Sequence, residues 1–296
     1  MSSANTGISK KLSAIVTAMR PKQWVKNVIV FAGLVFSKSF LDISLVAKAF
    51  FTFCLFSVVS GVVYIINDIV DREKDKLHPE KCKRPIASGR IKPGEALIYS
   101  ILMLIAALTL AFLLDVRLLA ILAAYFILVC LYSLVLKNII IVDVIAISVG
   151  FVLRTLGGTV VIDVMISPWL ILCTTLLSLF LALNKRKNEL TVLSGDAANH
   201  RKILDKYTPQ LIDNMLGVVT STTVMSYSLY TFEAGRSSHM MITIPFVLYG
   251  IFRYQYLVSS KNFGGSPELV LFKDKPLLID ILLWGITCLV IVGLYY

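Results

Sequence analysis

The chain has 296 residues, of which 57% are hydrophobic and only 16% are charged, with a formal net charge of +11 and a mean hydropathy of +0.81. A soluble domain carries about 25% charged residues, so the composition excludes an ordinary soluble protein. Apolar runs of about 18 residues or more recur, long enough to cross a hydrocarbon core roughly 30 Å thick. They lack the alternation of barrel strands. The sequence therefore predicts an all-α, polytopic membrane protein.

Nine transmembrane helices are predicted, at residues 25–41, 45–66, 94–114, 117–136, 139–162, 167–184, 210–232, 239–258 and 276–296. Several connections are very short, which makes neighbouring helices antiparallel and favours one compact bundle. We interpret residues 1–296 as a single integral-membrane domain. In it, residues 1–24 form an N-terminal segment, and residues 67–93 and 185–209 form the two loops in which we expect the functional site.

The basic residues are distributed unevenly between the two sides of this bundle. One side carries 24 of the 29 lysines and arginines, whereas the other keeps Lys38, Lys48, Arg117 and Arg236. Because basic loops remain in the cytoplasm, this bias predicts a cytoplasmic N-terminus and an external C-terminus in the cell membrane. Topology and attraction to anionic lipids explain part of the excess. Nucleic acid is not an expected partner, because the charges lie in short loops and no nucleic-acid motif occurs.

An acidic cluster follows the second predicted span. If the helix continues, Asp68, Asp71 and Asp75 have i, i+3, i+7 spacing and lie within about 60° of arc, with Asn67 at their flank. Oxygen ligands without His or Cys favour a hard cation, and Mg²⁺ is commonly shared between carboxylates and a phosphate-bearing substrate. The pattern therefore predicts a Mg²⁺–diphosphate site. A solvated loop whose acids balance nearby lysines is the alternative.

Basic residues and turn formers come directly after the acids. The stretch "HPEKCKRPIASG" supplies four basic side chains and two residues that shape a tight turn, namely His78, Lys81, Lys83 and Arg84, and Pro85 and Gly89. Cationic donors beside a metal–carboxylate site suit a diphosphate leaving group. This arrangement favours the metal site over the solvated loop.

Two further groups of charged residues follow. In the fifth span, Asp143 lies near the cytoplasmic end and within reach of the site. Arg154 lies deeper, where a structural ion pair is the alternative to a functional role. After the sixth span, "NKRKNEL" places Lys185, Arg186 and Glu189 on one helical face. Two cations with one acid suit a phosphate, although a positive-inside stop signal is the alternative.

The segments "NDIVDREKD" and "RPIASG", at the end of the second of nine spans, resemble the first aspartate-rich motif of the UbiA-type intramembrane prenyltransferase superfamily. The resemblance implies a bundle of nine transmembrane helices, a cytoplasmic active site and Mg²⁺ as the cofactor. Most members carry a second aspartate pair after the sixth span, and "NKRKNEL" departs from that pattern.

That departure resembles one branch of the superfamily, the decaprenyl-phosphate phosphoribosyltransferases. The segments "RPKQWVKN", "YSLVLKN", "YTPQLIDNM" and "FRYQYL" resemble the same branch. The resemblance implies transfer of 5-phosphoribose from 5-phosphoribosyl 1-diphosphate to a polyprenyl phosphate, for the synthesis of an arabinose-donor lipid of the cell envelope. The substrates and the bilayer are then the expected partners, and the exposed apolar bundle is compatible with homo-oligomerisation.

The resemblance also implies roles for individual residues. Asp68, Asp71 and Asp75 are expected to hold Mg²⁺, with Arg84 assisting the leaving group. The expected substrate-binding residues are Lys26, Asn67, Lys83, Tyr132, Lys137, Asp143, Lys185, Arg186 and Glu189. Two alternatives stay open: a prenyltransferase acting on an aromatic acceptor, as in quinone or haem O synthesis, and a lipid or ion transporter. The missing aspartate pair disfavours the first, and the rim position of the acids disfavours the second.

Overall fold

The computed structural model describes residues 11–193, 203–233, 238–261, 270 and 273–295, and the regular structure within these ranges is helical throughout. Residues 11–18 form a short first helix. The 3₁₀ helices are η1 (Pro21–Phe31), η2 (Ser39–Leu41), η3 (Lys81–Lys83), η4 (Leu136–Asn138), η6 (Leu204–Lys206) and η7 (Ser238–Thr243). The α-helices are α2 (Ala32–Phe36), α3 (Ile43–Val70), α4 (Arg72–Leu77), α5 (Pro93–Leu114), α6 (Val116–Leu134), α7 (Val142–Val161), α8 (Pro168–Leu193), α9 (Pro209–Glu233), α10 (Ile244–Lys261) and α12 (Lys275–Tyr295).

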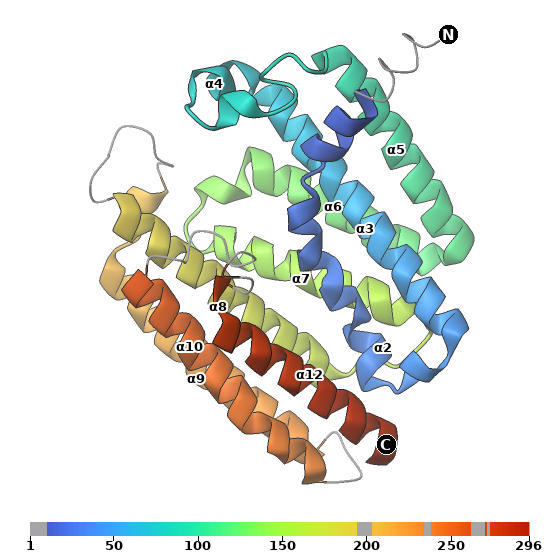
Figure 1. Cartoon of the computed structure of the whole chain (residues 1–296), viewed down its shortest axis with the longest axis vertical. Helices are drawn as coiled ribbons and strands as arrows, with labels where there is room; N and C mark the ends of the chain where they lie inside the picture. Colours follow the sequence, from blue (N-terminus) through green and yellow to red (C-terminus); the bar gives the residue numbers. More distant parts are fainter. Residues whose placement is uncertain (1–10, 194–202, 234–237, 262–269, 271–272, 296) are drawn as a thin grey trace.

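The helices form two groups on either side of α7 (Figure 1). The first group holds η1, α3, α5 and α6, and the second holds α8, α9, α10 and α12. Helix α7 packs against η1, α3 and α6 as well as against α8, so it joins the two groups. Hydrophobic clusters fill both groups, one around Phe56 and Tyr125 and another around Phe180 and Tyr254. The two groups therefore form one continuous helical bundle, with α7 between them.

Local sequence signals explain where the long helices begin. Asp42 caps α3 by accepting hydrogen bonds from the backbone amides of Ser44 at 2.7 Å and Leu45 at 3.4 Å. Asp115 caps α6 in the same way, accepting from the Arg117 amide at 2.7 Å. An N-terminal cap of this kind satisfies amides that have no partner within the helix. The caps therefore fix the turns that separate η2 from α3 and α5 from α6.

Seven helices within the described residues are long and apolar enough to cross a membrane: α3, α5, α6, α7, α8, η7 together with α10, and α12. The predicted all-α membrane fold is confirmed to this extent, and the count of nine is not. The predicted first span is divided between η1 and α2. The predicted seventh span corresponds to α9, which is 25 residues long but rich in Ser, Thr and Tyr. Helix α8 also continues to Leu193, so the predicted loop 185–209 begins as a helix.

The buried side chain of Arg154 links η1 to α7 through hydrogen bonds. Its guanidinium donates to Asn27 Oδ1 at 2.7 Å, to Tyr125 Oη at 2.5 Å and to the Gly150 carbonyl at 2.9 Å. All of these partners are uncharged. The ion pair considered for Arg154 from the sequence is therefore wrong, because its charge is stabilised by neutral acceptors and by the face of the Tyr125 ring.

Candidate active site

The end of α3 carries the acidic cluster in a nearly continuous helix. The Asp71 amide donates to the Asn67 carbonyl at 2.9 Å, and the Asp75 amide donates to the Asp71 carbonyl at 2.8 Å. The helical path therefore continues past the boundary between α3 and α4. Asp68 and Asp75 are buried, with 1% and 3% exposure, whereas Asp71 is half-buried. The predicted spacing is observed, but the three carboxylates have different surroundings.

Two arginines neutralise the buried carboxylates. One nitrogen of Arg84, Nη1, lies 3.1 Å from Asp68 Oδ1 and 2.6 Å from Asp75 Oδ2. Arg20 Nη2 also donates to Asp68 Oδ1, at 2.5 Å. The arginine side chains are 31% and 28% exposed, while the carboxylates are nearly sealed. The acids thus form a buried acidic pair whose charge is balanced by two partly exposed arginines.

Asp71 stands apart from this arrangement, since within the described residues its carboxylate has no hydrogen bond or ion pair. No group of three His, Cys, Asp or Glu side chains among the described residues has a spacing suited to a metal ion. The structure therefore joins Asp68 to Asp75 through Arg84, and it does not bring Asp71 into the same set.

A second polar cluster surrounds Arg186 on α8, which is only 1% exposed. Its Nε donates to Asp143 Oδ2 at 2.7 Å, its Nη1 donates to Glu189, and its Nη2 donates to Tyr132 Oη at 3.2 Å. Three further residues singled out from the sequence therefore surround the Arg186 guanidinium. Each nitrogen of Arg186 has one of these partners, so the guanidinium is held at the centre of a buried network.

Tyr207 completes this network. Its hydroxyl donates to Asp143 Oδ1 at 2.7 Å and accepts from the Ile141 amide at 2.8 Å. Burial, followed by the hydrogen bond to Asp143, raises the pKa of the Tyr207 phenol, so it remains a donor at neutral pH. Ile141 has a φ of +68°, which is rare for a β-branched residue. The tyrosine holds this strained turn at the start of α7.

Neighbouring residues of α6 connect the two clusters. Asn67 Nδ2 donates to Ser133 Oγ at 3.0 Å, and the adjacent Tyr132 accepts from Arg186. In Figure 1, α4 and the C-terminal end of α8 both lie toward the upper left of the molecule. The acids of α3 and the network of α8 therefore form two parts of one polar region.

The predicted lysines differ in exposure. Lys83 is exposed, and Lys26, Lys137 and Lys185 are half-buried. Within the described residues, Lys137 and Lys185 form no hydrogen bond or ion pair through their side chains. Two lysines close in sequence to the Arg186 network are thus available to bind an anion.

Sequence reasoning missed Arg20, Ser133 and Tyr207 as site residues. The position of Arg20 in "RPKQWVKN", close to Trp24 and Lys26, is the sequence signal that could have identified it. Its φ of +56° turns the chain between the helix at residues 11–18 and η1. Tyr207 belongs to "YTPQLIDNM", which carried part of the resemblance without a role being assigned to it.

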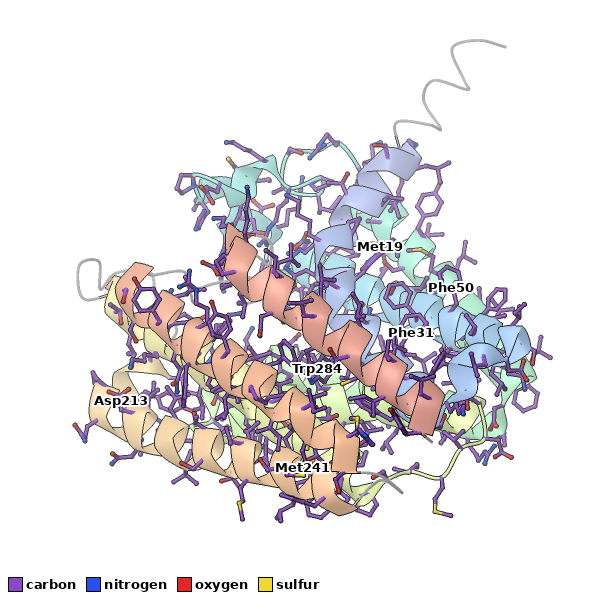
Figure 2. All side chains as sticks on the ribbon, turned by 60° about the horizontal axis from the view of Figure 1, so that its bottom comes forward. Met19, Phe31, Phe50, Asp213, Met241 and Trp284 are labelled. Atoms are coloured by element: carbon purple, nitrogen blue, oxygen red, sulfur yellow. The ribbon has the colours of Figure 1, made fainter. Side chains whose placement is uncertain are left out.

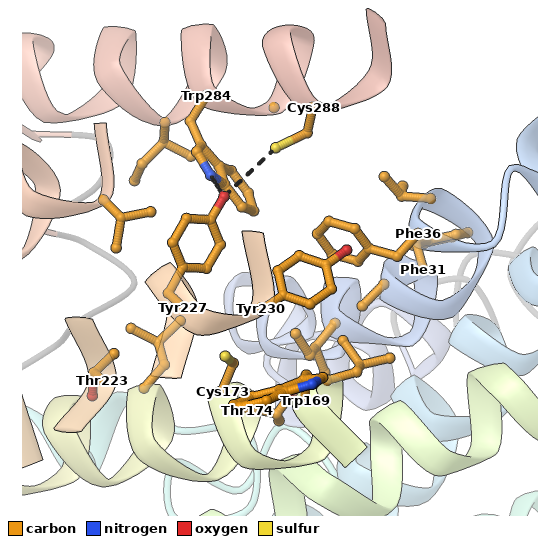
Figure 3. A pocket seen from close by; sticks show the side chains of 18 of the residues that line it. Phe31, Phe36, Trp169, Cys173, Thr174, Thr223, Tyr227, Tyr230, Trp284 and Cys288 are labelled. Atoms are coloured by element: carbon orange, nitrogen blue, oxygen red, sulfur yellow. Dashed lines mark hydrogen bonds between the residues drawn. The ribbon is translucent and has the colours of Figure 1, made fainter. Parts of the chain in front are cut away.

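A large apolar cavity of about 960 Å³ lies between η1, α2, α8, α9, α10 and α12. In Figure 2, Phe31 of η1 and Trp284 of α12 lie near the middle of the molecule, and both line this cavity. Figure 3 shows aromatic rings around it, with Tyr227 and Tyr230 opposite Trp169. Trp284 Nε1 donates to Tyr227 Oη at 2.8 Å, so these polar atoms satisfy each other and leave an apolar wall. The cavity suits a long hydrocarbon ligand.

Comparison with solved structures agrees with this architecture. A UbiA homolog from Archaeoglobus fulgidus bound to GPP and Mg²⁺ matches with a TM-score of 0.70 at 17% identity, covering 95% of this chain and all of that chain. The protein is thus a helical membrane protein with the fold of the UbiA homologs.

The sequence comparisons identify the family. The model of the UbiA prenyltransferase family matches residues 27–272. The decaprenyl-phosphate phosphoribosyltransferase of Mycolicibacterium smegmatis is 30% identical over 92% of this chain and 90% of its own length. That of Corynebacterium glutamicum is 32% identical over 93% and 85%. The chain belongs to the UbiA prenyltransferase family, as the aspartate-rich motif predicted.

Proposed function

We propose that this protein transfers 5-phosphoribose from 5-phosphoribosyl 1-diphosphate to a polyprenyl phosphate of the decaprenyl type. The observation that carries the proposal is the similarity to decaprenyl-phosphate phosphoribosyltransferases over nearly the full length of both chains. The Arg186 network supports it, because this network stands where most members of the superfamily have a second aspartate pair. The lipid product serves the synthesis of an arabinose donor for the cell envelope.

The donor diphosphate is assigned to the acidic cluster at the end of α3. Carboxylate oxygens of Asp68, Asp71 and Asp75 and the amide oxygen of Asn67 are the hard ligands that Mg²⁺ prefers. Asp68 and Asp75 both contact one cationic nitrogen of Arg84, which supports the proposal that these two carboxylates can bind a cation. A bound Mg²⁺ would neutralise charge on the departing diphosphate. Arg84, Arg20 and Lys83 are the chain's own donors for the same oxygens.

The remaining phosphates are assigned to the lysines of the polar region. Lys26, Lys137 and Lys185 are candidates for the 5-phosphate of the donor and the phosphate of the lipid. Arg186 acts as a positioning residue, since its three nitrogens hold Asp143, Glu189 and Tyr132 in place. In this part of the site, Arg186 holds other residues while lysines bind the phosphates, in keeping with the fixed geometry of a guanidinium and the mobility of an ammonium.

The lipid acceptor supplies both the nucleophile and the apolar chain. The chain is assigned to the cavity lined by Phe31, Phe36 and Trp284. An oxygen of the lipid phosphate forms a bond to ribose C1 while the bond from C1 to the diphosphate breaks. The nucleophile is already an anion, so the reaction needs no general base. The apolar surroundings exclude water from the electron-poor sugar carbon.

The proposed topology has nine crossings with the polar region in the cytoplasm. The segment formed by η1 and α2 has 16 residues, but a 3₁₀ helix rises about 2.0 Å per residue, so the segment reaches about 30 Å. Helix α9 is about 37 Å long at 1.5 Å per residue. Its hydroxyls bond to its own backbone, as in Ser221 to the Gly217 carbonyl at 2.9 Å, which lowers the cost of placing them in lipid.

One assay separates the proposed reaction from its alternatives. Purified protein is incubated with Mg²⁺, polyprenyl phosphate and 5-phosphoribosyl 1-diphosphate labelled in the ribose. A labelled lipid is expected, together with one diphosphate for each lipid formed. Turnover of a prenyl diphosphate with an aromatic acid, without a labelled ribosyl lipid, would instead support the prenyltransferase.

Matched variants test the acidic cluster in the same assay. Asp68→Asn and Asp75→Asn should each lower the rate by at least about a hundredfold, the scale on which a single electrostatic group acts in a transition state. Asp213→Asn is the control, because Asp213 is an exposed carboxylate at the end of α9 that pairs with Lys187 (Figure 2). Full activity of both Asp68→Asn and Asp75→Asn would contradict the role assigned to these carboxylates.

A further inference from the structure

One carboxylate lies inside the apolar cavity. Asp280 on α12 lines the cavity and is 8% exposed. Within the described part of the chain, its carboxylate has no hydrogen bond and no ion pair. An ionisable group within a membrane-spanning helix is costly unless it is paired, and it marks a functional site by default. Asp280 has no role in the proposed transfer of the phosphoribosyl group as derived from the acidic cluster and the lysines.

The backbone opposite Asp280 leaves its carboxylate accessible. Gly250 of α10 lines the same cavity, and a Cβ atom at this position would lie 3.1 Å from Asp280 Oδ2. That distance is shorter than ordinary contacts of a Cβ atom. With glycine there, the oxygen faces open space in the cavity. At this position, α10 therefore leaves space beside the Asp280 carboxylate and supplies no side chain that could pair with it.

Asp280 also lies close to the polar region. One helical turn before it, Leu277 packs in the same hydrophobic cluster as Val144 and Tyr207, which adjoin Asp143. On α8, Phe180 belongs to that cluster and lines the cavity. This cluster therefore borders the cavity near Asp280 and the polar region near Asp143. Under the proposed function, we expect the sugar carbon to meet the lipid phosphate along this border.

The chemistry of the proposed substrates leaves one group that can pair with this carboxylate. Their phosphates are anions and are repelled by it, and the polyprenyl chain has no hydrogen-bond donor. Only the 2- and 3-hydroxyls of the ribose can donate. We infer that Asp280 accepts a hydrogen bond from a ribose hydroxyl of the donor, and this inference rests on the proposed function. Asp280 then orients the sugar and selects ribose over a deoxyribose.

Sugar selectivity of this kind has a measurable size. A hydrogen bond to a charged group contributes more than one between neutral groups. A site built to bind a hydroxyl also rejects an analogue that lacks it, because the buried carboxylate is then left unpaired. The wild-type protein should therefore use the donor lacking the recognised hydroxyl roughly ten- to a hundredfold less efficiently, measured as kcat/KM.

The experiment compares 5-phosphoribosyl 1-diphosphate with its 2-deoxy and 3-deoxy analogues in the wild type, in Asp280→Leu and in Asp280→Asn. Leucine matches the carboxylate in shape and cannot accept a hydrogen bond. In Asp280→Leu, kcat/KM for the ribose donor should fall by about tenfold or more, and the preference over one analogue should shrink to within about twofold. That analogue identifies the hydroxyl. Asp213→Asn should keep the wild-type preference.

A merely structural role predicts a different result. If Asp280→Leu and Asp280→Asn lose thermal stability but keep the wild-type ratio between ribose and deoxyribose donors, the inference is wrong. Should Asp280→Leu fail to fold, Gly250→Ala provides a second test, because its methyl group presses on Oδ2 without removing the charge. A folded Gly250→Ala should have reduced sugar preference, and an unchanged ratio contradicts the inference. Wild-type protein that transfers no phosphoribosyl group refutes the proposed function itself.

Discussion

Individual charged residues in the interior are stabilised in two different ways. Arg186 and Asp143 form a charged pair that is almost completely buried, at 1% and 0% side-chain exposure. Arg154 is buried among neutral oxygens and an aromatic ring. A buried pair contributes little net stability when it is intact, because both groups lose hydration. Removing one partner is costly, since the other charge stays behind without compensation.

The pair of Asp143 and Arg186 leads to a prediction about stability. Asp143→Ala should lower the free energy of unfolding by up to about 3–5 kcal/mol, because it leaves the buried Arg186 with Glu189 as its one charged partner and removes the acceptor of the Tyr207 hydroxyl. The measurement is a denaturant titration in mixed micelles. Asp213→Ala, which breaks the exposed pair with Lys187, should cost about 1 kcal/mol or less. Equal losses in the two variants would contradict the buried-pair interpretation.

The three charged residues of the Arg186 network could be predicted from the sequence because each carries an unusual signal, whereas Tyr207 does not. Asp143 is a charge inside an apolar span, and Arg186 and Glu189 share a helical face. The contact of Arg20 with Asp68 could not be predicted, because it joins positions 48 residues apart and depends on how η1 packs against α3. Asp280 was also missed, since a single acid near the end of an apolar run leaves its hydropathy almost unchanged.

At the scale of elements, the positions and lengths of most helices could be predicted from the apolar runs. The first predicted span, 25–41, differs because residues 21–31 adopt a 3₁₀ helix. Its cause is tertiary: Asn27 and Val30 contact α7 so closely that the path of η1 is set by its neighbour. Helix α9 keeps its predicted position but owes its stability to packing against α8 and α10. Hydropathy alone could not reveal either feature.

The close approach of η1 to α7 depends on Gly158. A Cβ atom at this position would lie 1.9 Å from the Val30 carbonyl oxygen, which is far inside contact distance. Gly158→Ala must push backbone apart, so it should destabilise the protein by about 1–3 kcal/mol or more. Gly217→Ala on α9 is the control, because a Cβ atom there meets nothing within 4 Å. It should stabilise the helix by about 0.5–1 kcal/mol.

Thermal unfolding of both glycine variants in the same detergent checks this prediction. Gly158→Ala should melt at a lower temperature than the wild type, and Gly217→Ala at the same or a higher one. If the two variants melted together, η1 and α7 would not pack as closely as described.

At the scale of the whole molecule, the charge bias and the number of crossings together predict on which side of the membrane each loop lies. Seven and nine crossings both place the two ends of the chain on opposite sides, so the position of the C-terminus cannot distinguish them. Two segments must therefore be tested separately: the one formed by η1 and α2, and helix α9. For each, the test is whether its two ends lie on opposite sides of the membrane. Both segments have exposed residues at each end, which makes such a test feasible.

Single cysteines can be placed at these ends after replacing the five native cysteines with alanine. If both segments cross, cysteines at Lys22 and Asp213 should react with a membrane-impermeant maleimide only after the cells are opened. Those at Ser37 and Ser238 should react in intact cells. Met165, which is 96% exposed between α7 and α8, gives the external control. Labelling of Asp213 and Ser238 from the same side would leave α9 lying on one face.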